Sequence, residues 1–232
     1  MKCGKPAIGT DRTGIRQLGV EQEIEGRIMT AVKTPAGPRG RPTWEIAHLF
    51  PYQGAWSDDE YLTLNSNHLI EFSNGVLEVL PMPTEQHQQI VLLLYRILFA
   101  FISPNQLGTV LTAPLRVRLW DGKFREPDIV FLLAQHADRR GNKYWRGADL
   151  VMEVVSEDDP DRDLVTKRVE YAQAGICEYW LLDPRDRTVT VLALEAAASE
   201  YSIAGRYAQG ETARSVLLDG FSVEVTEVFS QS

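Results

Sequence analysis

Residues 150–160, LVMEVVSEDDP, decide the fold, because their first half has the composition of a β-strand that is buried on both faces. Glu153 lies inside this strand, between Met152 and Val154. Burying an unpaired carboxylate is costly and otherwise forces the group to take up a proton. The sequence therefore predicts a partner for Glu153, which is either a cation or, at a strand end, an arginine or backbone amides.

A second carboxylate belongs to the preceding apolar strand, PDIVFLL at residues 127–133, where Asp128 follows Pro127. If the two strands are neighbours, Asp128 and Glu153 can converge at one end of the pair. Two converging carboxylates need a counter-charge, and Mg²⁺ or Mn²⁺ supplies it through oxygen ligands and can activate water. We expect the backbone carbonyl of Val154 to assist as a metal ligand.

Lys167 is the third candidate, on a helix expected over residues 161–174. Leu164 and Tyr171 share its helix face, so this face is predicted to point partly inward. A lysine near two carboxylates can orient a water or hold a phosphate oxygen. The alternative is a surface ion pair with Asp163, four residues before it.

The other patterns predict an α/β fold with a central mixed β-sheet flanked by helices. A capping box of Ser57 and Glu60 begins a short helix, and Asn74-Gly75 is typical of a hairpin turn. The helix that Thr84 caps is apolar over most of its surface, so we expect it to be central to the core. Further strands are predicted at residues 109–120, 177–184 and 187–194, and residues 221–229 form either a strand or a helix.

Residues 1–43 are predicted to be a flexible N-terminal tail, with one domain over residues 44–232. The net charge is −8; residues 1–44 carry 8 Lys/Arg and 4 Asp/Glu, so the rest carries 16 basic and 28 acidic residues. Such an acidic body is no general polyanion binder, and any contact with nucleic acid requires a local basic patch. The loop over residues 134–148 provides one, with Arg140, Lys143 and Arg146.

The cysteine content and the apolar runs indicate where the protein acts. Cys3 and Cys177 are the two cysteines, one in the tail and one near a predicted strand, so no disulfide framework is expected. The apolar run at residues 90–102 is short for a membrane span and contains Arg96. We therefore predict a cytoplasmic protein with no membrane partner.

Three blocks of the sequence resemble the Uma-two family of restriction-endonuclease-like proteins, within the PD-(D/E)XK nuclease superfamily. They are IEFSNGVLEVLPMP followed by His87, then REPDIVFL, then LVMEVVSEDDPDRDLVTKRVEYAQAGICEYWLLDP. The resemblance covers roughly residues 57–185. It implies a restriction-endonuclease-like fold and Mg²⁺-dependent hydrolysis of DNA phosphodiester bonds.

The resemblance also implies roles for particular residues. Asp128, Glu153 and Lys167 match catalytic positions, and Glu71 matches an acidic position that completes the site. Val155 stands where the lysine of the superfamily's E-x-K motif would stand, so Lys167 on the following helix takes its place.

Other interpretations of these residues remain open. Glu71 could face solvent in the hairpin, and His87 could be a structural histidine or contact the substrate. The basic loop could be a solvated surface. The missing in-strand lysine leaves a catalytically inactive module that binds DNA or a protein as the alternative function. Cleavage of both strands of a duplex needs two sites or two events, which makes a homodimer plausible.

Overall fold

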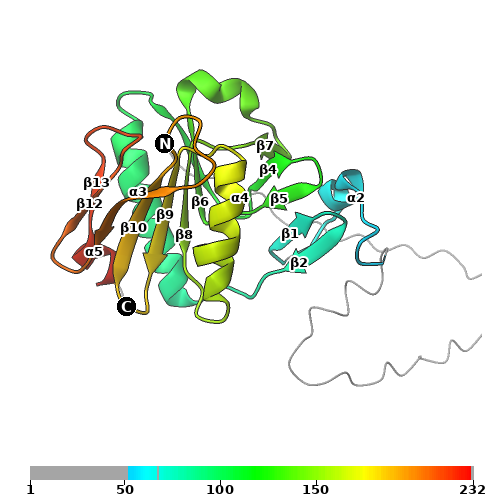
Figure 1. Cartoon of the computed structure of the whole chain (residues 1–232), viewed down its shortest axis with the longest axis horizontal. Coiled ribbons are helices and arrows are strands. Elements are labelled where there is room, and N and C mark those ends of the chain that lie inside the picture. The colour runs from blue at the N-terminus through cyan, green and yellow to red at the C-terminus, as the bar shows by residue number, and fades with distance from the viewer. Residues whose placement is uncertain (1–51, 67, 231–232) are drawn as a thin grey trace, which may run out of the picture. The chain divides into compact units, whose positions relative to one another are not determined.

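The computed structural model describes residues 52–66 and 68–230 of the chain. The predicted tail over residues 1–43, and Cys3 within it, lie outside these residues. Within them, the predicted α/β architecture is confirmed: a six-stranded mixed sheet is accompanied by a five-stranded sheet, a small two-stranded sheet and flanking helices (Figure 1).

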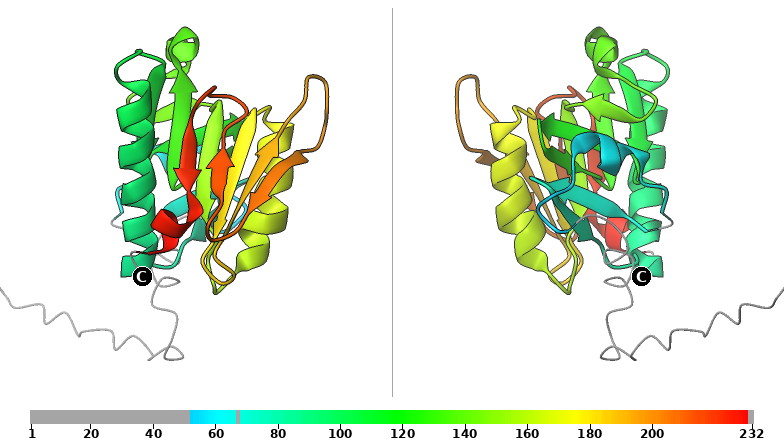
Figure 2. Two further views of the ribbon diagram at one scale, coloured as in Figure 1. Left: turned by 90° about the vertical axis from the view of Figure 1, so that its left-hand side faces the viewer. Right: turned by 90° about the vertical axis from the view of Figure 1, so that its right-hand side faces the viewer.

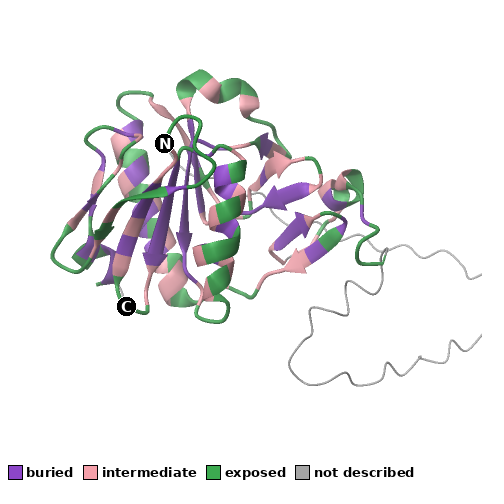
Figure 3. Cartoon of the chain, in the orientation of Figure 1, coloured by how far each residue is buried: buried purple, intermediate pink, exposed green. Residues whose placement is uncertain are grey.

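The six-stranded sheet has the strand order β11-β10-β9-β8-β6-β3. Its strands are β3 (Gly108–Thr112), β6 (Ile129–Leu133), β8 (Leu150–Val154), β9 (Glu178–Asp183), β10 (Thr188–Ala193) and β11 (Ser202–Tyr207). β8 pairs antiparallel with β6 and parallel with β9. All five residues of β8 are buried, as Figure 3 shows, so this strand is the centre of the fold.

The five-stranded sheet has the order β2-β1-β5-β4-β7. Its strands are β1 (Ile70–Ser73), β2 (Val76–Val79), β4 (Arg116–Trp120), β5 (Lys123–Arg125) and β7 (Tyr144–Arg146). The single strand that we expected over residues 109–120 is wrong. The chain instead turns between Thr112 and Arg116, so that β3 and β4 belong to different sheets. Pro114 lies at this turn, where its missing N–H is not needed by a sheet ladder.

The predicted hairpin and the predicted short helix are confirmed. Asn74 and Gly75 connect β1 to β2 with φ angles of 47° and 83°, the left-handed values that a tight hairpin turn requires. The helix α2 (Asp58–Thr63) begins with a complete capping box, in which Ser57 and Glu60 bond each other's backbone amides.

Helices cover both faces of the six-stranded sheet (Figure 2). The helix α3 (Glu85–Ile102) packs on one face, where Ile90 and Leu94 join a core with Met152. The helix α5 (Val225–Phe229) joins the same core. On the other face, α4 (Arg168–Gln173) and the five-stranded sheet enclose a second core around Val151. Successive side chains of β8 therefore point alternately into the two cores.

The expectation that α3 is central to the core is confirmed, but only one face of the helix is buried. Leu92 and Phe99 are 58% and 50% exposed, while Ile90, Leu94 and Leu98 are buried. One face of the helix therefore packs on the core, while apolar side chains on the opposite face remain exposed. No helix among the described residues is long and apolar enough to cross a membrane.

The C-terminal region contains elements that the sequence analysis missed. The strands β11 and β12 (Thr212–Arg214) were not predicted. β12 pairs with β13 (Ser222–Glu224), which leads directly into α5, so residues 221–229 contain both a strand and a helix.

Glu178 joins this C-terminal region to the central sheet. The carboxylate is buried at the start of β9, where it accepts hydrogen bonds from Trp180 Nε1 at 2.5 Å and Ser215 Oγ at 2.8 Å. It also accepts from the backbone amides of Val216 and Leu217, each at 2.6 Å. A buried carboxylate with four donors is well compensated, and its loss would leave those donors without partners.

We expect Glu178→Ala to lower the free energy of unfolding by about 3 kcal/mol, because buried amide and indole donors lose their acceptor. Urea denaturation measures this loss. The control is Glu200→Ala, an exposed carboxylate, for which the change is expected to stay below about 0.5 kcal/mol. Equal losses in the two variants would contradict a joining role for Glu178.

Candidate active site

Asp128 and Glu153 meet at one end of the β6–β8 pair. Asp128 directly precedes β6, and Glu153 is the fourth residue of the antiparallel β8. The backbone amide of Val154 donates to Asp128 Oδ2 at 2.8 Å, and the amide of Asp128 donates to Glu153 Oε2 at 3.3 Å. The two strands are neighbours, which was the condition for the two carboxylates to converge, and each carboxylate is bonded to the backbone of the other strand.

Lys167 contacts Glu153 from the helical segment that follows β8. Its Nζ lies 2.9 Å from Glu153 Oε1 and 3.0 Å from Asp163 Oδ1, and its side chain is 5% exposed. Burial opposes its charge, but the carboxylates of Glu153, Glu71 and Asp163 outweigh that effect and raise the pKa of Lys167. The ammonium group is therefore charged at neutral pH.

The backbone around Lys167 has an unusual form. The segment η2 (Arg162–Lys167) is a π-helical turn that continues into α4. π-turns are rare and occur frequently at functional sites. Here the wide turn contains both Asp163 and Lys167, and it turns both side chains inward. The ion pair with Asp163 that we considered as a surface alternative does exist, but it is buried and forms part of the site.

Tyr171 is a site residue whose contact the sequence analysis did not predict. Its hydroxyl donates to Glu153 Oε1 at 2.6 Å, and the side chain is completely buried. Tyr171 lies four residues after Lys167 on the same helix face, and this spacing was the available signal. Glu153 is thus held by an ammonium group, a phenol and a backbone amide.

Glu71 lies beside this site but is occupied by other partners. Its Oε2 pairs with Arg125 Nη1 at 2.6 Å and with Arg162 Nη2, and its Oε1 accepts the backbone amide of Glu126 at 3.1 Å. Its Oε1 is 3.8 Å from Lys167 Nζ. Burial disfavours the charged form, yet these three cations hold the pKa of Glu71 well below its ordinary value. The hairpin residue is buried, so the solvent-facing alternative is wrong.

The partners of Glu71 belong to a larger network of ion pairs. Arg125 and Arg162 also contact Glu78, at 2.5 Å and 2.9 Å. Arg125 and Lys123 contact Glu170 on α4, at 2.7 Å and 2.6 Å. We call this set the arginine network: its three carboxylates, on Glu71, Glu78 and Glu170, balance the three cations of Lys123, Arg125 and Arg162. The network is neutral, and it ties η2 and α4 to the five-stranded sheet.

His87 contacts the site from the first turn of α3. Its Nε2 lies 3.0 Å from Asp128 Oδ2, while its buried Nδ1 has no hydrogen-bond partner among residues 52–66 and 68–230. Burial acts against its protonation, but the neighbouring carboxylates, Asp128 first, raise the pKa of His87. The imidazole is therefore placed to position Asp128.

The basic loop is not brought to the carboxylates. It connects the end of β6 at Leu133 to the start of β8 at Leu150, whereas Asp128 and Glu153 lie at the other end of these strands. The loop contains η1 (Ala134–Arg139) and β7, and Arg140, Lys143 and Arg146 all lie on it. The loop that was predicted to offer a basic patch to nucleic acid therefore leaves the two strands at the end opposite to the carboxylates.

The charges and donor atoms at the site fit a divalent cation. Asp128, Glu153 and Asp163 contribute three carboxylates against the single ammonium group of Lys167. Burial, with the nearby charges of Asp128 and Asp163, raises the pKa of Glu153 to about 8 despite the opposing charge of Lys167. A bound cation would lower the pKa of Glu153 again, because it favours the charged carboxylate. No hydrogen bond or ion pair in the described part of the chain uses Asp128 Oδ1, which leaves an oxygen ligand available.

The donor set is small, which is typical of Mg²⁺. In the part of the chain that the structure describes, no group of three or more His, Cys, Asp and Glu side chains is arranged to hold a metal. Mg²⁺ usually keeps several waters and binds through one or two carboxylates, so two carboxylates and a backbone carbonyl are sufficient. Asp128 and Glu153 therefore supply the number of carboxylates that this ion would need.

A mixed sheet that brings Asp and Glu together beside a buried lysine defines a restriction-endonuclease-like fold. The sequence model of the Uma2 family, described as "Putative restriction endonuclease", matches residues 58–226. This is well over half of the 232 residues, so the chain belongs to the Uma2 family, and the predicted resemblance is confirmed.

The fold is also similar to that of a solved structure. A "putative nuclease belonging to DUF820" from Anabaena variabilis superimposes with a TM-score of 0.62 at 19% sequence identity. The match covers 75% of this chain and 98% of that chain. At this identity the similarity shows the fold alone. No curated protein matches the sequence.

We expect Glu71→Gln to lower the free energy of unfolding by about 3 kcal/mol near neutral pH, because buried Arg125 and partly buried Arg162 lose a counter-charge. The pKa of Glu71 is lower in the folded protein than its ordinary 4.5. Its contribution to stability is therefore complete above that pH and is lost progressively as the pH falls below it. The wild type should thus lose stability more steeply than Glu71→Gln between about pH 5 and pH 3.

Denaturant unfolding at a series of pH values measures both effects. The control is Glu78→Gln, which contacts the same two arginines but has a side chain that is 26% exposed. This control should lose less stability than Glu71→Gln. Parallel pH curves for the wild type and Glu71→Gln would contradict the assignment.

Proposed function

We propose that this chain is a divalent-metal-dependent endonuclease that hydrolyses phosphodiester bonds in DNA. The membership of the Uma2 family supports a nuclease, and the geometry supports the mechanism. The observation that carries the proposal is the position of Lys167, whose Nζ lies 2.9 Å from Glu153. Val155, which stands in place of the superfamily's lysine, is buried in an apolar core. The helix supplies the ammonium group that the strand lacks.

Each residue has a distinct role in this proposal. Asp128, Glu153 and the carbonyl of Val154 would hold the ion. When bound, Mg²⁺ or Mn²⁺ neutralises charge on the scissile phosphate and lowers the pKa of a water. The raised pKa of Lys167 keeps it protonated, so it stabilises developing negative charge and orients water, and it is not a general base. Tyr171 and His87 fix the orientation of Glu153 and Asp128.

Glu71 has an indirect role in the proposed mechanism. Its two oxygens are bonded to Arg125, Arg162 and a backbone amide, so it is a positioning residue for η2 and Lys167. This replaces the catalytic role that the family resemblance implied for it. The proposed setting is cytoplasmic, where Mg²⁺ is abundant and Cys177, an exposed free thiol, stays reduced.

We expect Asp128→Asn, Glu153→Gln and Lys167→Met each to reduce plasmid cleavage in Mg²⁺ or Mn²⁺ by about 100-fold or more, because each removes a charge at the reacting phosphate. Initial rates of supercoiled-plasmid nicking measure the effect. Asp219→Asn, at an exposed carboxylate, is the control and should cleave at the wild-type rate. Equal activity in all variants would overturn the site.

Metal binding separates the role of Lys167 from that of the carboxylates. Asp128→Asn and Glu153→Gln remove ligands, so we expect calorimetry to show Mn²⁺ affinity reduced by about tenfold or more. Lys167→Met removes a neighbouring positive charge, so its Mn²⁺ affinity should equal or exceed that of the wild type. An equal loss of affinity in all three variants would contradict the separation of roles.

The alternative function is a nuclease-like module that binds DNA or a protein without cleaving it. The acidic body of the chain favours this alternative. The absence of metal-dependent cleavage of any DNA form, supercoiled, linear or single-stranded, would select it over the endonuclease.

We also propose that the protein acts as a homodimer, since cutting both strands of a duplex in one encounter needs two sites. Size-exclusion chromatography with light scattering measures the mass in solution. A monomer at the concentrations at which duplex DNA is linearised would exclude this arrangement.

A further inference from the structure

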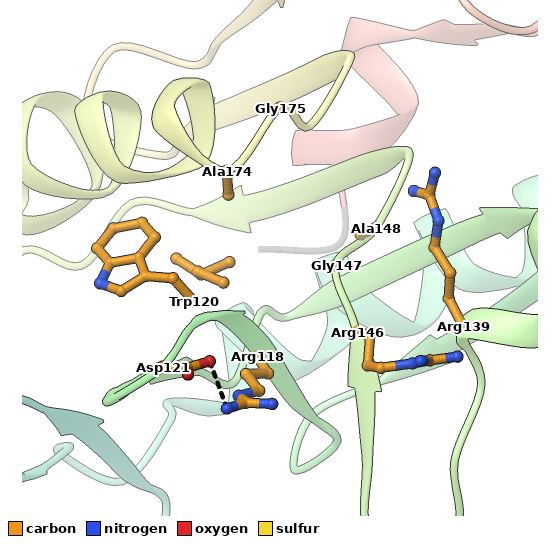
Figure 4. Close-up of a pocket in the computed structure, with 10 residues that line it drawn as sticks. Arg118, Trp120, Asp121, Arg139, Arg146, Gly147, Ala148, Ala174 and Gly175 are labelled. Atoms are coloured by element: carbon orange, nitrogen blue, oxygen red, sulfur yellow. Dashed lines mark hydrogen bonds and ion pairs between the residues drawn. The ribbon is translucent and has the colours of Figure 1, made fainter.

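A pocket of about 430 Å³ lies at the end of β8 that is remote from the carboxylates. Figure 4 shows Trp120 beside Ala174 at one end of it, and Arg139 and Arg146 at the other. Its lining is Arg118, Leu119, Trp120, Asp121, Arg139 and Arg146, with Gly147, Ala148, Ala174 and Gly175. A Cβ added at Gly147 or Gly175 would meet no atom within 4 Å, so the glycines leave this space open.

Arginines outnumber carboxylates among the residues that line the pocket, and each arginine also has an aspartate outside the lining within 3.8 Å, namely Asp58, Asp149 or Asp138. Three arginines from three elements, β4, η1 and β7, face the single lining carboxylate of Asp121. Arg118 pairs with Asp121 at 2.5 Å, and its buried Nε has no hydrogen-bond partner in the described residues. Arg139 and Arg146 are 39% and 60% exposed, and their nearest carboxylates are 3.7 Å and 3.8 Å away. Arg146 Nη2 also donates to the backbone oxygen of Asp138 at 2.5 Å, so the other donors of these exposed guanidinium groups are the ones available to an anion.

The pocket is separate from the candidate active site. The path along β8 from Ala148 to Glu153 spans about 17 Å at the usual rise of a strand. α4 runs alongside, and the ion pairs of its Glu170 with Arg125 and Lys123 close the space between the helix and β5. A ligand in the pocket therefore does not contact the carboxylates of Asp128 and Glu153.

We infer that this pocket binds one nucleotide of a single-stranded nucleic-acid segment, with phosphate oxygens on Arg139 and Arg146 and an unpaired base stacked on Trp120. Its size suits a nucleotide, and a partly exposed indole beside guanidinium groups suits a base and a phosphate. Lys143 and Arg140 are exposed on the same loop and extend the positive charge beyond the pocket. That extension favours a strand over a free nucleotide, and the choice of nucleic acid rests on the proposed function.

The test is fluorescence anisotropy with a labelled oligothymidylate of about 12 nucleotides, in EDTA so that no cleavage occurs. The double variant Arg139→Ala/Arg146→Ala should bind about tenfold or more weakly than the wild type. The slope of log affinity against log salt should fall by about 1.4, since each lost phosphate contact to a single strand contributes about 0.7. Trp120→Ala should weaken binding by about tenfold without changing the salt slope.

The control is Arg185→Ala/Arg206→Ala, two arginines that pair with aspartates elsewhere on the surface, and it should bind like the wild type. Wild-type affinity in the pocket variants would overturn the inference. Unlabelled thymidine monophosphate and unlabelled oligothymidylate are also compared as competitors of the labelled strand. If the two compete equally well, the ligand is a free nucleotide and not a strand.

The same variants distinguish a failure of this inference from a failure of the proposed function. If the wild type cleaves no DNA, and the pocket variants bind the oligothymidylate more weakly than the wild type does, the result would support the pocket and overturn the endonuclease. If the wild type cleaves plasmid DNA, and the pocket variants bind the oligothymidylate as tightly as the wild type does, the result would overturn the pocket alone.

Discussion

The buried contact between Lys167 and Glu153 is the interaction on which the rest of the site depends. Glu153 lies in β8, in which all five residues are buried and an unpaired carboxylate could not remain charged. Lys167, on the helical segment that faces β8, is also buried, and its charge likewise needs a partner. Each compensates the other at 2.9 Å, and Tyr171 adds a hydrogen bond to Glu153. This contact also fixes the direction in which the chain continues after β8, because the π-turn must place Lys167 over the strand.

Two groups of charges surround this contact, and they differ in their balance. The arginine network has three carboxylates and three cations, so it is complete without a ligand and serves to hold η2 and α4 against the five-stranded sheet. Asp128, Glu153 and Asp163 have only Lys167 as a charged partner of opposite sign in the described residues, unless His87 is protonated. The uncompensated charge lies where the two strands meet, and this difference locates the expected cation.

Much of the site followed from the sequence because it depends on local patterns. The apolar runs around Asp128 and Glu153 predicted two strands, and the helical spacing of Leu164, Lys167 and Tyr171 predicted a face that points partly inward. The π-turn was not predictable from this spacing, since it departs from the regular period by one residue. The partners of Glu71 were missed because Arg125 and Arg162 are 54 and 91 residues away in the sequence.

The connections between strands decide where two further segments lie. The loop with the predicted basic patch lies away from the carboxylates, because Asp128 directly precedes β6 and Glu153 is near the end of β8. In an antiparallel pair the start of one strand lies beside the end of the other, so the connection between them is at the far end. Residues 109–120 were expected to be one strand because their alternation continues through Pro114, yet the two halves belong to different sheets.

The central claim is that the excess negative charge between β6 and β8 is a binding site for one divalent cation. The most direct measurement is a crystal structure of the protein soaked in Mn²⁺, with an anomalous difference map. The account predicts one peak at about 2.1–2.2 Å from oxygens of Asp128 and Glu153, with Lys167 still beside Glu153. A map with no peak between these carboxylates, while Mn²⁺ occupies another place on the protein, would contradict it.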